Sequence, residues 1–208
     1  MERRAVSAAA ACALALVLAL DASSSIAAPD WKLQVEATGA ALASEQAVRA
    51  IETSGGVAVA AIGFTEDPGV MVPWTVLRDG ADARAFAARL AEAERPPGSY
   101  TDIAGAIDAA LLAMEVAPCE AERRVMDLSS DGKASAWLGD TAQARDRAQE
   151  AGVTINAIGV GDEANGWLRE NAVTAGGFAV ESADWAGYAS ALRKKITQEL
   201  AARWWLSQ

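Results

Sequence analysis

The stretch LVLALDASSSIAA, residues 16–28, separates two accounts of this chain. In the first account it ends a secretory signal peptide, because Arg3 and Arg4 precede the apolar run and small residues follow it. In the second account Leu14–Leu20 form a fully buried strand, and Asp21 begins a polar loop at the carboxyl end of that strand. Both accounts use the same residues, so the rest of the chain has to decide between them.

Composition narrows the classes of protein that this chain can belong to. With 208 residues, 52% of them hydrophobic, the chain can bury the core of one domain. A net charge of -10 disfavours nucleic acid as a partner, because phosphate binding requires clustered Lys and Arg. The absence of His excludes Ser-His-Asp and Cys-His catalysis and His-containing zinc sites. The apolar run over residues 5–20 is shorter than the ~20 residues of a spanning helix, so we expect no transmembrane segment.

The chain contains two cysteines, Cys12 and Cys119. Two cysteines make neither a dense disulfide framework nor a four-thiolate metal site. A single bridge between them is one alternative, but such sparse use of cysteine favours two free thiols.

Helical and strand patterns alternate along the chain. The spacing of apolar residues predicts helices over residues 29–54, 79–94, 101–116, 138–152, 167–173 and 184–205. Runs of β-branched and small apolar residues predict strands over residues 14–20, 57–66, 70–77, 123–128, 153–162 and 176–182.

This alternation predicts an α/β fold with a doubly wound, mostly parallel central sheet and helices on both faces, as in Rossmann-like folds. One strand differs from the rest. Pro73, in the strand over 70–77, has no amide hydrogen to donate to a ladder, so we expect this strand at an edge of the sheet. The short loop before it favours antiparallel pairing with the strand over 57–66.

Oxygen-rich loops lie where the predicted strands end. The alternate spacing of Asp21, Ser23 and Ser25 places their side chains on one side of an extended loop. Thr101 opens a predicted helix, and Asp131 follows a later strand. Because such loops converge at the carboxyl edge of a parallel sheet, one cation could contact all of them. Hard oxygen donors with few charges suit Mg²⁺, and Mn²⁺ could substitute.

The motifs DASSS, TDI and SSDG, in this order, resemble the metal-ion-dependent adhesion site of von Willebrand factor A (VWA) domains. The family pattern is Asp-x-Ser-x-Ser, then Thr, then Asp, and its five positions correspond to Asp21, Ser23, Ser25, Thr101 and Asp131. The resemblance implies that the serines and the threonine contact the metal directly, while one or both aspartates act through water. The sequence around the motifs, including RRVMDLSSDG and VTINAIGVGD, is similar to the sequences of a bacterial branch of exported proteins of undefined function.

The resemblance favours the strand in the opening question. Signal cleavage after Ala28 would leave Thr101 and Asp131 without the rest of their site. We therefore expect an N-terminal segment over residues 1–13, which is a degenerate export signal merging into the first strand, one VWA-like domain over 14–202, and a C-terminal tail over 203–208.

The resemblance implies a binding module rather than an enzyme. Uncharged hydroxyl ligands leave a divalent ion electrophilic, while Asp21 and Asp131 balance its charge nearby. The metal would then accept a Glu or Asp from a protein partner. The family resemblance also suggests a periplasmic or secreted location, whereas a cytoplasmic one follows if the N-terminal run is only the first strand.

Two other functions are alternatives. A metal-assisted hydrolase acting on phosphate esters would use Asp21 or Asp131 as nucleophile or base. Such enzymes usually add a cation to neutralise developing charge, and near the predicted site only Lys133 is available. The second alternative is a VWA scaffold that binds no metal.

Neighbouring residues have simpler expected roles. We expect Asp102 to cap the helix beside Thr101, Ser130 to donate a hydrogen bond to the site, and Trp137 to lie at its rim. Trp204 and Trp205 close the last predicted helix, and we expect them to pack on their own domain.

Overall fold

The computed structural model describes residues 10–201. Within them six strands and seven helices follow one another in the order β1 (Ala10–Asp21), α1 (Ala28–Leu42), α2 (Glu45–Ser54), β2 (Val57–Phe64), β3 (Gly69–Leu77), α3 (Gly80–Glu92), α4 (Ile103–Glu115), β4 (Cys119–Ser130), α5 (Thr141–Glu150), β5 (Val153–Val160), α6 (Asp162–Asn171), β6 (Ala179–Ser182) and α7 (Trp185–Ala201).

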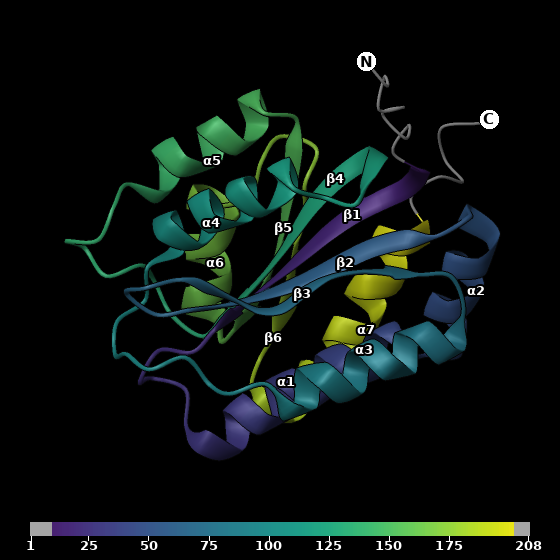
Figure 1. Cartoon of the computed structure of the whole chain (residues 1–208). Helices are drawn as coiled ribbons and strands as arrows, with labels where there is room; N and C mark the ends of the chain where they lie inside the picture. The colour runs from purple at the N-terminus through teal and green to yellow at the C-terminus, as the bar shows by residue number, and fades with distance from the viewer. Residues whose placement is uncertain (1–9, 202–208) are drawn as a thin grey trace.

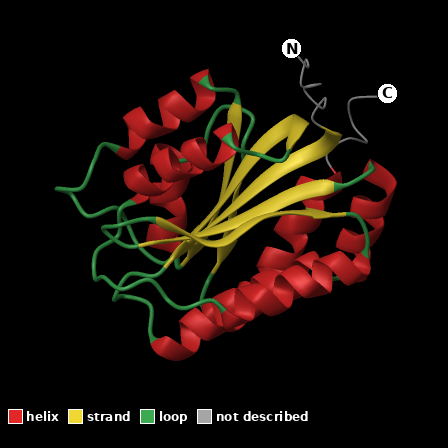
Figure 2. Ribbon diagram, in the orientation of Figure 1, coloured by secondary structure: helices red, strands yellow, loops and turns green. Residues whose placement is uncertain are grey.

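The strands form one six-stranded sheet in the order β3-β2-β1-β4-β5-β6. All neighbouring pairs are parallel except β2 and β3, which are antiparallel. Helices α1, α2, α3 and α7 lie on one side of the sheet and α4, α5 and α6 on the other, as Figures 1 and 2 show. The predicted fold class is therefore confirmed, and β3, which contains Pro73, is the expected antiparallel edge strand.

The central strand β1 has both of its faces covered. Its residues from Cys12 to Asp21 are all buried. Leucines of alternate positions pack with α1 and α7, and the small residues between them pack with α4 on the other face. A strand covered on both sides needs apolar residues at every position, which is why the run at Leu14–Leu20 reads as continuous. The strand predicted there is confirmed, and it extends back to Ala10.

The single helix predicted over residues 29–54 is wrong, because the structure has two helices there. α1 ends at Leu42 and α2 begins at Glu45. Ser44 is the N-cap of α2, and its hydroxyl accepts a hydrogen bond from the Ala47 N–H. A capping serine satisfies a backbone donor that the first turn leaves free, so the second helix starts anew rather than continuing the first.

Other element bounds also differ from their predicted ones. α6 begins at Asp162 instead of residue 167, because Gly161, with φ 88°, turns the chain directly out of β5 into the helix. α7 is described as far as Ala201, so the predicted extension through Trp204 and Trp205 and the tail over 203–208 lie outside the described residues. None of the helices between residues 10 and 201 combines the length and the apolar character needed to cross a bilayer.

Cys12 and Cys119 form a disulfide bond, so the expectation of two free thiols was wrong. The two residues are 107 positions apart in the sequence, but their Cα atoms are 5.8 Å apart. The reason is the strand order: β1 and β4 are parallel neighbours, and Ala10 pairs with Cys119 at their amino ends. The bond therefore closes a ring that contains the chain from β1 to the start of β4.

A buried charge network attaches α7 to β4. Lys195 on α7 is fully buried, and its Nζ lies 2.5 Å from Asp127 Oδ1 and 2.7 Å from Glu199 Oε1. Burial by itself would lower the pKa of Lys195, but the two carboxyl groups raise it above its usual value. Burial and the nearby Asp127 charge raise the pKa of Glu199 to about 8. At neutral pH Glu199 therefore retains its proton.

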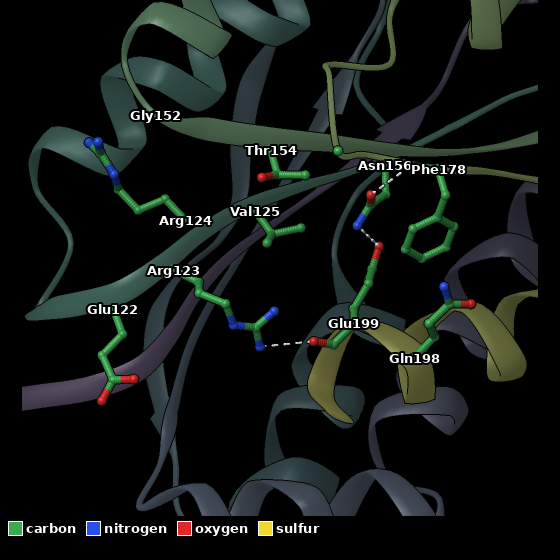
Figure 3. Close-up of a pocket in the computed structure, with 11 residues that line it drawn as sticks. Glu122, Arg123, Arg124, Val125, Gly152, Thr154, Asn156, Phe178, Gln198 and Glu199 are labelled. Carbon is green, nitrogen blue, oxygen red and sulfur yellow. Dashed lines mark hydrogen bonds between the residues drawn. The ribbon is translucent and has the colours of Figure 1, made fainter. Parts of the chain in front are cut away.

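A hollow of about 470 Å³ lies beside this network, at the amino ends of β4 and β5. Figure 3 shows how its polar groups connect the strands to α7. Arg123 Nη2 donates to the Glu199 carbonyl at 2.9 Å. Asn156 donates to the Glu199 carboxyl at 2.8 Å and accepts from the Phe178 N–H at 3.1 Å. These hydrogen bonds hold the last described turn of α7 on the sheet.

Replacing both cysteines by serine should lower the free energy of unfolding by about 2–4 kcal/mol, because the unfolded chain loses a long covalent ring. Urea unfolding of the double variant and of the wild-type protein measures the difference. Adding a reductant should destabilise the wild type and leave the variant unchanged. Equal stability of the two oxidised proteins would contradict the prediction.

Glu199→Gln should reduce the pH dependence of stability between about pH 6.5 and 8.5. The pKa of Glu199 is raised in the folded state, so folding retains a proton that an unfolded Glu has already released. The wild-type free energy of unfolding should therefore fall with rising pH, by at most about 1.4 kcal/mol per pH unit. Gln imitates the protonated acid, so the variant should show a flatter profile.

Chemical unfolding at a series of pH values checks this prediction. Asp21, whose pKa is raised to about 6, adds a slope of the same sign, but mainly below the pH window chosen here. Exposed Glu150, replaced by Gln, serves as the matched control and should keep the wild-type slope. An unchanged slope in Glu199→Gln would show that this residue does not hold the proton.

Candidate metal centre

The loops that follow the parallel strands converge at the carboxyl edge of the sheet (Figures 1 and 2). Asp21 is the last residue of β1 and Ser130 is the last residue of β4, and these two strands are neighbours. The register pairs Leu20 with Ser129, so both strands end at the same level. This register brings the loops after Asp21 and Ser130 together although they lie far apart in the sequence.

Asp21 is the buried centre of this edge, with no exposed surface. Its Oδ1 accepts from the Ser23 N–H at 2.8 Å, and its Oδ2 accepts from the Ser130 hydroxyl at 2.6 Å. Burial raises the pKa of Asp21 to about 6, the hydrogen bonds from Ser130 and Ser23 oppose the rise, and the charge of Asp131 adds to it. Ser130 thus has the donor role expected for it.

Ser23, Ser25 and Asp131 extend the cluster outward. Their side chains form a chain in which Ser23 Oγ and Ser25 Oγ are 3.0 Å apart and Ser25 Oγ donates to Asp131 Oδ1 at 2.7 Å. Since Ser25 gives its proton to Asp131, Ser23 is the donor in the first bond. Together with Ser130, the cluster therefore contains two carboxylates and three hydroxyls that are connected by hydrogen bonds.

Thr101 is attached to this cluster through the backbone of its loop. Its carbonyl accepts from the Ser135 N–H at 2.9 Å, and its own N–H donates to Ser135 Oγ at 3.2 Å. On the other side Ser24 donates to the Ser99 carbonyl from both its N–H and its hydroxyl, at 3.1 and 2.9 Å. Thr101 is buried, and its hydrogen bonds to Ser135 run through its backbone. The structure thus places Thr101 between the other two loops. The side chains of Ser23, Ser25 and Asp131 contact one another, and the Asp21 carboxylate joins them through the Ser23 N–H.

Asp102, rather than Thr101, caps α4. Its side chain accepts a hydrogen bond from the Gly105 N–H at 2.8 Å. This is the role expected for Asp102, and it leaves Thr101 outside the capping interaction.

Arg95 has a role at this edge that the sequence did not indicate. Its guanidinium donates to the carbonyl oxygens of Ala22, Ser23 and Ile26 at 2.7–3.2 Å. It also lies over the ring of Trp31, 5.5 Å from the ring centroid. Arg95 therefore binds the loop that carries Ser23 and Ser25 by three of its carbonyl groups. A basic residue in a Pro-rich loop carries no signal for this role, which depends entirely on how the loops meet.

A buried hydrogen-bond chain leads from Asp21 to α7. Gln34 Nε2 donates to the Asp21 carbonyl at 2.9 Å, and Gln34 Oε1 accepts from the Ser129 hydroxyl at 2.7 Å. Ser129 Oγ lies 2.9 Å from the Tyr188 hydroxyl, which is consequently the donor. The backbone of the loop after β1 is thus connected to the last helix through α1 and β4.

The donor set fits a hard divalent cation. In the part of the chain that the structure describes, no Lys or Arg forms an ion pair with Asp21 or Asp131. Lys133, the cation that a hydrolase would have nearby, is paired with Glu163 at 2.5 Å. Among residues 10–201 no three His, Cys, Asp or Glu side chains gather as a metal-binding group. The edge instead offers two carboxylates with neutral hydroxyls, which suits Mg²⁺ or Mn²⁺ rather than a thiolate-bound metal.

Solved structures of VWA domains share this fold. Proximal thread matrix protein 1 (PTMP1) from the mussel byssus superposes with a TM-score of 0.70 at 16% identity, over 93% of this chain and 49% of PTMP1. The vWF domain of the type V pili tip protein Mfa5 from Porphyromonas gingivalis gives 0.65 at 14% identity, over 92% of this chain and 96% of that domain. Manganese-loaded TRAP protein from Plasmodium vivax gives 0.58 at 17% identity, over 89% and 74%.

These similarities establish the fold, which is that of VWA domains. The present chain spans about half the length of PTMP1. One PTMP1 structure, with a TM-score of 0.68 at 19% identity over 94% of this chain and 47% of that chain, has a zinc-occupied MIDAS motif, the metal-ion-dependent adhesion site.

No curated protein sequence matches the chain. The family described as protein of unknown function (DUF1194) matches residues 11–204, and this chain belongs to that family.

Proposed function

We propose that this protein is a divalent-cation-dependent binding module, which presents Mg²⁺ to an acidic side chain of a protein partner. The observation that carries the proposal is the buried Asp21 carboxylate, which is grouped with Asp131 and three serine hydroxyls and forms no ion pair with a Lys or Arg of residues 10–201. A buried carboxylate without a counter-charge is unfavourable, as the raised pKa of Asp21 shows. A divalent cation at the cluster would supply the missing charge.

The residues present divide into two groups around such an ion. Ser23, Ser25 and Thr101 offer neutral hydroxyl oxygens, and Asp21 and Asp131 offer the negative charge. When bound, Mg²⁺ would supply a Lewis-acidic position that a carboxylate can occupy. Neutral ligands from the protein favour this role, because they leave the ion with an unsatisfied attraction for an anion.

The zinc-occupied MIDAS motif of PTMP1 and the manganese-loaded TRAP protein support a divalent cation on this fold, and Mn²⁺ could replace Mg²⁺. We also propose a periplasmic or secreted location. The disulfide between Cys12 and Cys119 supports it, since such bonds persist in oxidising compartments.

Calorimetric titration with Mg²⁺ tests the proposal. Wild-type protein at neutral pH should bind one ion, and Asp21→Asn or Asp131→Asn should lower its affinity at least about tenfold, because each removes a full negative charge. Asp162→Asn is the matched control: it removes an exposed carboxylate of α6, next to the same edge, and should bind Mg²⁺ as the wild type does.

The same titration below pH 6 gives an independent check. The pKa of Asp21 is about 6, so protons compete with the metal there and the affinity should fall by roughly tenfold per pH unit. Unaltered Mg²⁺ binding by the doubly substituted Asp21→Asn, Asp131→Asn protein, or no binding by the wild type, would overturn the proposal.

Arg95→Lys should weaken Mg²⁺ binding although Arg95 is no ligand. Lysine keeps the positive charge but cannot donate to the carbonyls of Ala22, Ser23 and Ile26 at once, so the serine loop loses its fixed shape. A hydrogen bond to a charged group contributes about 1.5–3 kcal/mol to stability. If the loop of Arg95→Lys must be reordered when Mg²⁺ binds, the loss of one such bond lowers the affinity roughly tenfold or more.

Calorimetry and metal-free thermal unfolding of Arg95→Lys measure the two consequences separately. Arg89→Lys is the control, because Arg89 also lies over an aromatic ring, that of Phe86, but on α3. Wild-type affinity in Arg95→Lys would show that the serine loop holds its conformation without the guanidinium.

A further inference from the structure

Two large aromatic side chains lie exposed next to the candidate metal centre. Tyr100 is 47% exposed and Trp137 is 65% exposed. Their ring centroids are 4.7 Å apart and the ring planes are inclined by 79°, which is an edge-to-face contact. Trp137 belongs to the loop that begins with Asp131, and its place at the rim of the metal centre stays a prediction.

The aromatic pair is continuous with the metal centre. Tyr100 directly precedes Thr101 in the chain. The hydrogen bonds between Thr101 and Ser135 join the loop of Tyr100 to the loop of Trp137. A partner whose carboxylate reached the metal would therefore pass over or beside these rings. Two loops that both present a large ring to solvent here form a surface for contact rather than part of the core.

The surroundings of the aromatic pair are negatively charged. Glu66 Oε2 accepts from the N–H groups of Ser99 and Tyr100 at 2.8 and 2.9 Å, and these bonds lower the pKa of Glu66, so that it stays ionised. Asp102, two residues after Tyr100, caps α4, and Asp140, three residues after Trp137, caps α5.

None of these three carboxylates forms an ion pair with a Lys or Arg of residues 10–201. Their negative charges are therefore not neutralised by a cation of the described chain. The electron-rich face of an exposed tryptophan ring also attracts cations. Both features favour a positive charge at the same position, and they repel a second acidic group.

We infer that Tyr100 and Trp137 form the docking platform for a Lys or Arg side chain that accompanies the metal-binding carboxylate of the partner. This inference rests on the proposed function, and it names the chemistry of the partner: an acidic residue with a basic residue close to it. A uniformly acidic segment would be repelled by Glu66, Asp102 and Asp140 wherever its charges came within about a Debye length of them. The metal centre alone would accept any carboxylate, so the platform confers the selectivity.

A selection with displayed random peptides tests the inference. The full chain, in buffer with Mg²⁺, captures peptides, and elution with EDTA recovers only those whose binding needs the metal. We expect the recovered peptides to carry Asp or Glu with Lys or Arg within a few residues. Recovery of peptides with a carboxylate but without an excess of basic residues would overturn the inference.

A thermodynamic cycle on the tightest recovered peptide locates the basic residue. Replacing that residue by norleucine should lower the affinity for wild-type protein severalfold and have little further effect on Trp137→Ala. Leu112→Ala is the matched control, because Leu112 is also 65% exposed but lies on α4. This variant should show the full wild-type dependence on the basic residue, and equal dependence in Trp137→Ala would overturn the platform.

Titration of the free protein with Mg²⁺ alone separates the two proposals. If Trp137→Ala and wild type bind Mg²⁺ equally but no metal-dependent peptide is recovered, the platform is wrong and the metal centre stands. If the wild type binds no Mg²⁺, the proposed function fails and the inference fails with it.

Discussion

The fully buried carboxylate of Asp21 is the constraint on which the functional edge of this protein depends. It ends the central strand of a sheet whose two faces are covered by helices, so it cannot be hydrated as a surface carboxylate is. The structure meets this cost with hydrogen bonds from Ser23 and Ser130, and no Lys or Arg among the described residues forms an ion pair with Asp21. This incomplete compensation is the basis of the proposed cation site.

A second buried cluster, three residues before the end of β4, solves a similar problem in a different way. There the buried carboxyls of Asp127 and Glu199 are compensated from within the chain, by Lys195 and by a retained proton. Between the two clusters, Ser129 and Tyr188 continue the polar contacts along β4 and α7. One face of α7 is thus attached to β4 by polar groups at more than one position along the helix, Tyr188 and Lys195. Burying such groups is costly unless each is paired, so they fix the helix in one position more strictly than apolar packing does.

Much of the fold was predictable because parallel sheets leave a strong local signal. The continuous apolar run of β1 and the proline in β3 identify a central and an edge strand without any knowledge of their neighbours. The oxygen-rich loops could be found for the same reason, since each directly follows or adjoins an element with clear periodicity. The grouping of Asp21, Ser23, Ser25 and Asp131 follows from the strand register, and their metal binding stays a prediction.

What the sequence did not reveal depends on which elements become neighbours. The disulfide requires β1 beside β4, and Arg95 acts through backbone carbonyls, which every residue possesses. Lys195 belongs to a run of three basic residues that looks solvent-exposed, yet it faces the sheet. The covalent ring closed by Cys12 and Cys119 has a last consequence: it encloses the loops of both Asp21 and Thr101, while Asp131 lies beyond it. A protease that cut once inside this ring would leave both fragments linked in one molecule, so nicking would go unseen until the sulfur bridge was reduced.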